Sequence, residues 1–281
     1  MSTFRAKKLI SDNLKIPTLP SVITRINELI DDPQTGAAEI GAAIAEDAPL
    51  VAKVLRIANS AFYGLREPCL SAEQASAVLG LRVLRNVVTQ AAVIQQFDHL
   101  RQHPGFDIDE LWRHAILTSQ LCGFIARRCG GRVNLRPDES QVCGLLHDIG
   151  KVIMLDGMGG EFLDVVDEAR LLGHRLHVVE EQRLGFNHTD IGALLSVRWG
   201  LPSAVSAAIQ YHHGPREQLE TDSVVSLVAN ANLLAHRVAD GELEAALATI
   251  DPPTARFLGL CQSDVEDVLE FGLQAIACVE V

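Results

Sequence analysis

The chain contains 281 residues, of which 48% are hydrophobic and 21% are charged. This apolar content is enough to offset the entropy lost on folding, so an intrinsically disordered chain is excluded. The 24 lysines and arginines against 36 aspartates and glutamates give a net charge of −12, and such an acidic surface repels phosphate backbones and argues against nucleic-acid binding.

Six cysteines are scattered along the chain, and none forms a C-x-x-C pair. A chain of this length does not need disulfide bonds to fold, so we expect buried free thiols of a reducing compartment. The N-terminus lacks the apolar core of a signal peptide, and no stretch reaches the roughly 18 uninterrupted apolar residues that a membrane span needs. We therefore expect a cytoplasmic protein without a membrane span.

Apolar residues in the first hundred positions repeat with helical spacing. A stripe over residues 19–30 ends at Asp31-Asp32-Pro33, which predicts the first helix. Loop character peaks at residues 99–106, so we predict an N-terminal helical bundle over residues 14–100. Further helices are predicted to begin at two N-cap signals, Asp47 and the capping box Ser71-x-x-Gln74.

The rest of the chain is also helical by pattern. Asp109 is the expected N-cap of a long helix that ends at Gly130-Gly131. Pro137-Asp138-x-x-Gln141 is expected to open a short helix that continues through residues 142–149 and ends at Gly150. The capping box Ser263-x-x-Glu266 is expected to begin the last helix. The fold class is therefore all-α, with a second helical subdomain over residues 106–213 and a C-terminal helical extension over residues 214–281.

The pair His147-Asp148 is the most informative feature of the sequence. Its neighbours between residues 142 and 149 are small or apolar, so this helix is expected to be buried on nearly all sides. A buried carboxylate needs a partner, and a divalent cation shared with His147 would supply one. The alternative is structural: Asp148 pairs with Lys151 or a helix N-terminus, and His147 donates a hydrogen bond to a carbonyl.

Further histidines lie on predicted helices or at their ends. Taken one at a time, each is best explained as a packed or capping side chain, but together with His147-Asp148 they favour a shared site. The set is His114, His188, His212 and His213. Five other histidines have polar neighbours and are expected at the surface, namely His99, His103, His174, His177 and His236.

The order of these motifs resembles the HD superfamily of metal-dependent phosphohydrolases, and most closely its HDOD branch, the HD-related output domains of bacterial signalling proteins. The resemblance covers residues 14–213. The strings that carry it are Asp47-Ala48-Pro49-Leu50, Asn59-Ser60-Ala61-Phe62-Tyr63-Gly64, Trp112-Arg113-His114, Leu145-Leu146-His147-Asp148-Ile149-Gly150-Lys151, Asn187-His188-Thr189-Asp190, Trp199-Gly200-Leu201-Pro202 and His212-His213.

The resemblance implies a multi-helix HD-like fold and a metal set that consists of His114, His147, Asp148, His188 and one or both of His212 and His213. The late aspartate of the HD pattern is missing. Asn230 matches its position best, although Asn232 flanks the same apolar stripe equally well. An amide oxygen adds no negative charge, so affinity for the ion and activation of a bound water are both expected to fall.

Two functions remain open at this stage. The first is a stand-alone signalling module that binds protein partners or a small ligand, such as a nucleotide or cyclic dinucleotide, without turnover. The second is a metal-dependent phosphohydrolase in which Lys151, the one cation inside the motif, stabilises charge on the phosphoryl group. Imidazole and carboxylate ligands suit iron, manganese, nickel or zinc, and whether a metal is bound at all is left open.

Overall fold

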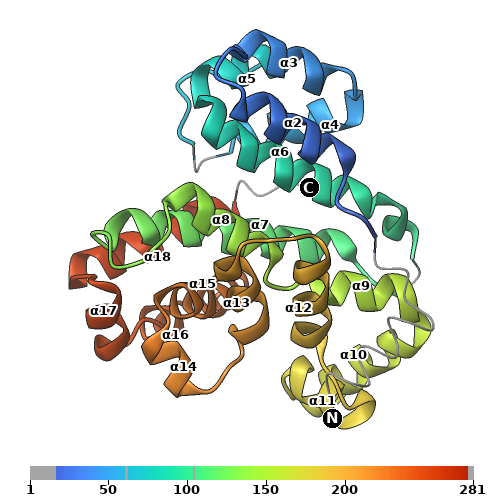
Figure 1. Ribbon diagram of the computed structural model, residues 1–281. Coiled ribbons are helices and arrows are strands. Elements are labelled where there is room, and N and C mark those ends of the chain that lie inside the picture. The colour runs from blue at the N-terminus through green and yellow to red at the C-terminus, as the bar shows by residue number, and fades with distance from the viewer. Residues whose placement is uncertain (1–16, 61–62, 104, 278–281) are drawn as a thin grey trace.

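The computed structural model describes residues 17–60, 63–103 and 105–277, and for Leu243 and Leu247 it describes the backbone only. These residues form helices and no strand, which confirms the all-α prediction (Figure 1). No helix within the described ranges combines the length and apolar character that crossing a membrane would require.

The N-terminal part is a bundle of short helices. It is composed of α2 (Ser21–Asp31), α3 (Ala37–Ala45), α4 (Ala48–Ala58), α5 (Ala72–Leu79) and the longer α6 (Leu81–Gln96), followed by the 3₁₀ turn η1 (Asp98–Gln102). The predicted caps are present: Asp47 accepts a hydrogen bond from the backbone N–H of Leu50, and Ser71 accepts one from Gln74. These bonds satisfy backbone donors that have no partner inside the helix.

The second part is arranged around one long helix, α7 (Ile108–Arg128). α8 (Pro137–Leu146) packs along it, as do α15 (Ser223–Ala239) and α18 (Gln262–Ile276) (Figure 1). The remaining helices are α9 (Ile149–Met158), α10 (Gly160–Leu172), α11 (Leu176–Leu184), α12 (His188–Arg198), α13 (Ser203–Tyr211), α14 (Arg216–Thr221), α16 (Leu243–Leu247) and α17 (Pro252–Leu258).

Three predicted helix boundaries are wrong. Asp107, not Asp109, caps α7, because its carboxylate accepts the backbone N–H of Glu110. The last helix begins one residue after Cys261, whose N–H donates to Asp264, so the Ser263 box is not used. In both places a second acidic or small residue two positions away offers an equivalent cap, and sequence alone does not choose between them.

The third wrong boundary is at the His-Asp motif. The short helix α8 ends at Leu146, and a new helix, α9, begins at Ile149, so that Gly150 lies inside a helix and does not end one. Asp148 has the non-helical backbone angles φ −101° and ψ 11°. His147 and Asp148 therefore occupy the junction between two helices, where the chain changes direction.

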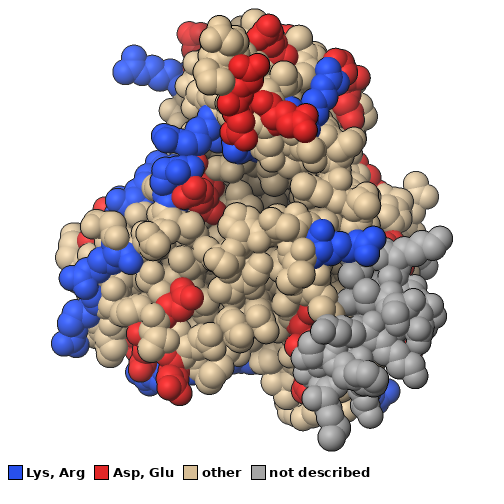
Figure 2. Space-filling view, in the orientation of Figure 1, with Lys and Arg blue, Asp and Glu red and all other residues tan. Residues whose placement is uncertain are grey.

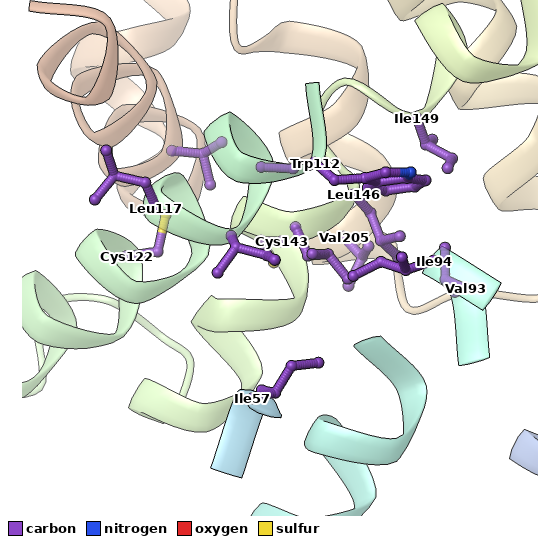
Figure 3. Close-up of a cluster of buried hydrophobic side chains, with 14 of the residues drawn as sticks. Ile57, Val93, Ile94, Trp112, Leu117, Cys122, Cys143, Leu146, Ile149 and Val205 are labelled. Carbon is purple, nitrogen blue, oxygen red and sulfur yellow. The ribbon is translucent and has the colours of Figure 1, made fainter. Parts of the chain in front are cut away.

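Buried apolar side chains from both parts of the chain form one large core. Figure 3 shows a region of it in which Ile57 of α4 and Ile94 of α6 lie near residues of α7, α8, α9 and α13. Of the cysteines in the described ranges, Cys69, Cys122, Cys129 and Cys143 are buried free thiols, as expected, whereas Cys261 is exposed.

The Asn59–Gly64 string has a structural role where it is described. The Asn59 side chain donates to the carbonyl of Cys69 and accepts from its backbone N–H, which closes the loop after α4. Tyr63 donates a hydrogen bond to Gln141 of α8 and so connects the bundle to the second part. Ala61 and Phe62 lie outside the described residues.

Charge is unevenly distributed over the face shown in Figure 2. Acidic side chains gather over the N-terminal bundle, and basic side chains follow one edge of the molecule. The net negative charge is therefore not a uniform property of the surface.

Candidate metal centre

Helix ends bring the predicted site residues together. His147 follows the last residue of α8, Asp148 precedes α9, His188 is the first residue of α12, and His212 follows the last residue of α13. All four side chains are almost completely buried, with exposed fractions between 0% and 3%. The sequence-predicted residues thus converge on one point in the fold.

Glycines allow two of these helices to approach closely. Gly150 of α9 lies directly against the backbone carbonyl of His188 and close to the backbone nitrogen of Gly192, both on α12. A larger residue at Gly150 would push α9 and α12 apart, whereas one at Gly192 would meet Ile209 of α13. The glycine after His147-Asp148 is therefore a packing residue that places Asp148 next to His188.

Backbone carbonyls fix the orientation of two imidazole rings. The Nδ1 atom of His147 lies 2.7 Å from the carbonyl oxygen of Gly144, and Nδ1 of His212 lies 3.0 Å from that of Ile209. A carbonyl oxygen only accepts hydrogen bonds, so Nδ1 carries the proton in both rings. These bonds satisfy carbonyls at the ends of α8 and α13 and leave a lone pair on each Nε2 atom.

The free nitrogen atoms of three rings surround the Asp148 carboxylate. Nε2 of His147 lies 3.2 Å from Oδ2, while Nε2 of His188 and of His212 lie 3.2 Å and 3.4 Å from Oδ1. None of these three nitrogens has a hydrogen-bond partner, and neither has Asp148 Oδ1. Four buried atoms with lone pairs therefore face one another.

Such an arrangement fits a cation. A neutral imidazole nitrogen and a carboxylate oxygen repel each other unless a positive charge lies between them, and both are good ligands for divalent transition metals. Ligand atoms of Asp148, His188, His212 and His213 all lie within 4.8 Å of one another, and those of His114, His147 and Asp148 form a second such group. The residues present thus fit a metal ion that shares Asp148.

Burial also favours the neutral form of the His212 and His114 rings, as metal ligation requires. It lowers the pKa of His212 to about 4 and holds the pKa of His114 well below its ordinary value, where His236 and His147 lower it further. Burial alone would raise the pKa of Asp148, but His147 and the cationic Lys151 more than reverse this, and that pKa lies well below its ordinary range. Asp148 is therefore ionised.

Lys151 is the cation closest to this carboxylate. Its Nζ atom lies 2.5 Å from Asp148 Oδ2, one turn along α9. This is the ion pair that the structural alternative predicted. It involves Oδ2 and leaves Oδ1 without a hydrogen-bond partner, so the ion pair and the cation-binding geometry at Oδ1 coexist.

His114 of α7 lies at the edge of the cluster. Its Nε2 atom is 4.0 Å from Asp148 Oδ2 and 2.9 Å from the side-chain oxygen of Asn232 on α15. Asn230 also lines the cavity, but its amide donates to the carbonyl of Ser226 in its own helix. Of the two asparagines, Asn232 is thus the one that contacts a candidate ligand, although the motif pattern favours Asn230.

Glu180 of α11 is a buried carboxylate that the sequence interpretation missed. It has no exposed surface, and its Oε2 atom lies 2.6 Å from Nδ1 of His188. Burial opposes protonation of His188, but the charge of Glu180 outweighs it and raises the pKa of that ring. A more basic imidazole is a stronger ligand. The only signal in the sequence is the pair Glu180-Glu181, which resembles an ordinary exposed helix face.

Two histidines expected at the surface contact the cluster instead. The ring of His236 stacks on His114, and the half-buried ring of His177 stacks on His213, in each case with ring centroids 4.1 Å apart. Both outer rings line a cavity next to the Asp148 cluster. His236 is exposed and His177 is partly exposed, and both face this cavity.

A cavity of about 770 Å³ adjoins the centre. Side chains of α7, α10 and α15 form apolar parts of its wall, and the Asp148 cluster lies on its polar side, together with Lys151. Arg113, Arg170 and Arg175 also line it. This volume lies in the range of pockets that hold small molecules of nucleotide size.

Comparison with known proteins finds a matching domain family and a relative of similar sequence. The HDOD domain model matches residues 16–215. A protein without assigned function from Treponema pallidum (strain Nichols) is 31% identical over 231 residues, which is 81% of this chain. The match covers 43% of that protein, so the chain spans less than half of its relative's length.

Two solved structures show a similar fold. An HDOD domain protein of unknown function from Geobacter sulfurreducens superposes with a TM-score of 0.79 at 25% identity, over 98% of this chain and 95% of that one. A Shewanella amazonensis SB2B protein, provisionally named a phosphohydrolase, gives a TM-score of 0.73 at 21% identity over 98% of both chains.

Proposed function

Because the chain belongs to the HDOD domain family, we propose that it is a bacterial signal-transduction module that works by binding and not by turnover. In this proposal the His–Asp centre holds a divalent transition metal, iron, manganese, nickel or zinc. The adjoining cavity binds a small phosphate-bearing ligand, such as a nucleotide or cyclic dinucleotide. Protein partners would respond to the occupied state.

The observation that carries this proposal is the amide at Asn232. Among the described residues, Asp148 is the one carboxylate in the two groups of candidate ligands, and the α15 side chain that forms a hydrogen bond with His114 is an asparagine. An amide does not accept a proton, so it does not act as a general base for an attacking water. It also adds no charge, and a divalent ion with Lys151 would leave the centre positively charged.

A positively charged, mostly enclosed centre favours an anionic ligand. In this arrangement His147, His188, His212 and Asp148 would hold the metal, which as a Lewis acid would polarise a phosphate oxygen when bound. Lys151 lies beside the same carboxylate, and its ammonium would approach a second phosphate oxygen. The apolar wall of the cavity would exclude water and so strengthen these charge interactions.

The second candidate function is a metal-dependent phosphohydrolase. It is favoured by the convergence of His114, His147, His188 and His212 on Asp148, since a metal can generate a nucleophile without a protein base. Lys151 would then stabilise the charge that develops on the phosphoryl group.

Elemental analysis of protein purified without added metal or chelator tests the proposal. We expect a stoichiometric transition metal, lost in His147→Ala, and no release of phosphate or mononucleotide from a substrate panel that includes cyclic-di-GMP. Turnover abolished by His147→Ala would overturn the proposal in favour of the hydrolase. Absence of metal in a protein that also fails to take up added metal would remove the metal centre from either function.

A further inference from the structure

We propose that Glu180 is the positioning residue of the metal centre, and that it joins the α10–α11 hairpin to that centre. The proposal rests on the metal binding inferred above. Glu180 is on the opposite side of His188 from Asp148 and belongs to neither group of candidate ligands. Its effect on a metal would therefore be exerted through the His188 ring.

One carboxylate oxygen of Glu180 holds both the backbone and the ring of His188. Oε2 accepts the backbone N–H of His188 at 2.9 Å and the ring Nδ1–H at 2.6 Å. With Nδ1 as the donor, the lone pair of the ring is on Nε2, which lies 3.2 Å from Asp148 Oδ1. The carboxylate thus selects the tautomer and the rotation that direct Nε2 at the cluster.

Capping of α12 accounts for only one of these two bonds, the one from the backbone N–H of His188. Asn187 already caps that helix, because its side-chain oxygen accepts the backbone N–H of Thr189, and Asp190 accepts the N–H of Asn187. A buried charge is costly to retain, and the second oxygen of Glu180, Oε1, has no hydrogen-bond partner. An uncharged acceptor would satisfy the same donors at lower cost, so we infer that the charge serves the ligand.

The hairpin of α10 and α11, which carries Glu180, has a small apolar cluster of its own, although Phe162 and Val166 of α10 also belong to the main core. Val165 and Ala169 of α10 pack against Val179 of α11 in a small cluster separate from the main core. α11 packs mainly on α10 and only lightly on α12. Two contacts on one face of α11 reach the centre: Glu180 bonds His188, and His177, one turn earlier, stacks on His213. Metal binding should therefore restrict the motion of this hairpin.

The test compares Glu180→Gln and Glu180→Leu with the control Glu181→Gln, which removes the neighbouring exposed carboxylate of the same helix. Zn²⁺ titration calorimetry should show affinity about 10–100-fold lower in the Glu180 variants and unchanged in the control. The Gln variant keeps the size of the side chain and can still accept from Nδ1, so it should lose less than the Leu variant.

Two further measurements separate positioning from a merely structural role. In chelated protein at a pH where the ring is neutral, ¹⁵N NMR should find His188 as the Nδ1–H tautomer, and less of it in both Glu180 variants. Hydrogen exchange over residues 160–184 should slow when Zn²⁺ binds the wild type, and less so in Glu180→Gln.

The role of Glu180, its connection to the hairpin and the metal function are each contradicted by a different result. Equal Zn²⁺ affinities and equal His188 tautomers in Glu180→Gln and Glu181→Gln would overturn the role of Glu180. If hydrogen exchange over residues 160–184 is the same with and without Zn²⁺, the proposed connection between the hairpin and the metal centre is overturned. If the wild type binds no Zn²⁺ but the tautomer changes as expected, the proposed metal function fails while the orientation of His188 by Glu180 stands.

Discussion

A Cβ atom on Gly150 would lie 1.8 Å from the backbone carbonyl oxygen of His188. No side chain fits at that distance, so α9 and α12 must separate if Gly150 is replaced. Asp148 is attached to one of these helices and His188 to the other, and their ligand atoms are 3.2 Å apart. The glycine thus determines the geometry of a pair of side chains that it does not touch.

Gly150→Ala should therefore damage both stability and metal binding. Forced separation of packed helices costs about 1–3 kcal/mol, which exceeds the gain in helix propensity from alanine. Chemical unfolding and Zn²⁺ titration measure the two effects. Gly160→Ala is the matched control, because a Cβ there meets nothing within 4 Å. Equal behaviour of the two variants would show that the close approach does not position the centre.

Saturating metal should stabilise the protein. Free metal at a hundred times its dissociation constant adds about 2.7 kcal/mol to the free energy of unfolding when it binds only the folded state. The gain should disappear in His212→Ala, since that ring supplies one of the unpartnered nitrogens, and should persist in His174→Ala, whose side chain is exposed. Thermal unfolding with and without chelator measures this gain in stability for each protein. A His212→Ala protein that still gains stability from metal would contradict the assignment of this ligand.

His147→Ala separates packing from ligation. If His147 is a metal ligand, the destabilisation relative to wild type should be large with metal and should shrink after chelation, because both proteins then lack the ion. If His147 serves only packing and the hydrogen bond to Gly144, the loss should be the same in both conditions. Unfolding curves of both proteins in both conditions distinguish the two.

Asn232→Asp should raise the affinity for a divalent ion by about tenfold or more, because it adds a negative charge next to His114. In chelated protein the same change should lower the free energy of unfolding by about 1–3 kcal/mol, since the new buried carboxylate lacks a cation. Asn230→Asp is the control, as its side chain bonds to its own helix. A larger affinity gain in Asn230→Asp would reverse the assignment of the two positions.

Lys151→Met should affect metal and phosphate in opposite directions. Loss of the ammonium beside Asp148 removes repulsion of a cation and should strengthen metal binding several-fold, but it should weaken binding of inorganic phosphate to the metal-loaded protein. Lys53→Met, which breaks an ion pair with Asp98 away from the centre, should change neither. Calorimetric titrations of both ligands suffice. Stronger phosphate binding in Lys151→Met would show that this lysine does not face the anion.

The amino-acid sequence predicts the fold class and the candidate ligands for physical reasons. Helical periodicity and N-caps such as Asp47 depend on local chemistry, and the His147-Asp148 pair stands out because its neighbours are apolar. Local patterns do not distinguish between two residues of the same type that lie two positions apart. Asn230 and Asn232 point about 200° apart on a helix, so the choice between them depends on how α15 is rotated against α7. For the same reason the sequence predicts Asp109 as the cap of α7, whereas Asp107 caps it.

The residues that contact the candidate ligands from outside could not be predicted from local sequence patterns. Glu180 and Glu181 are identical in type and adjacent, and only the packing of α11 beside α12 buries the first and exposes the second. His177 and His236 have polar sequence neighbours, yet each stacks on a histidine from a distant helix. These contacts depend on tertiary structure alone.

The position of α15 has a consequence for how such proteins diversify. This helix lies after the segment that matches the family model, and yet it contributes Asn232, Leu233 and His236 to the cavity wall. The histidines and Asp148 of the centre all lie before it. Substitutions on this one helix would therefore reshape the wall of the cavity while His147, Asp148, His188 and His212 stay in place.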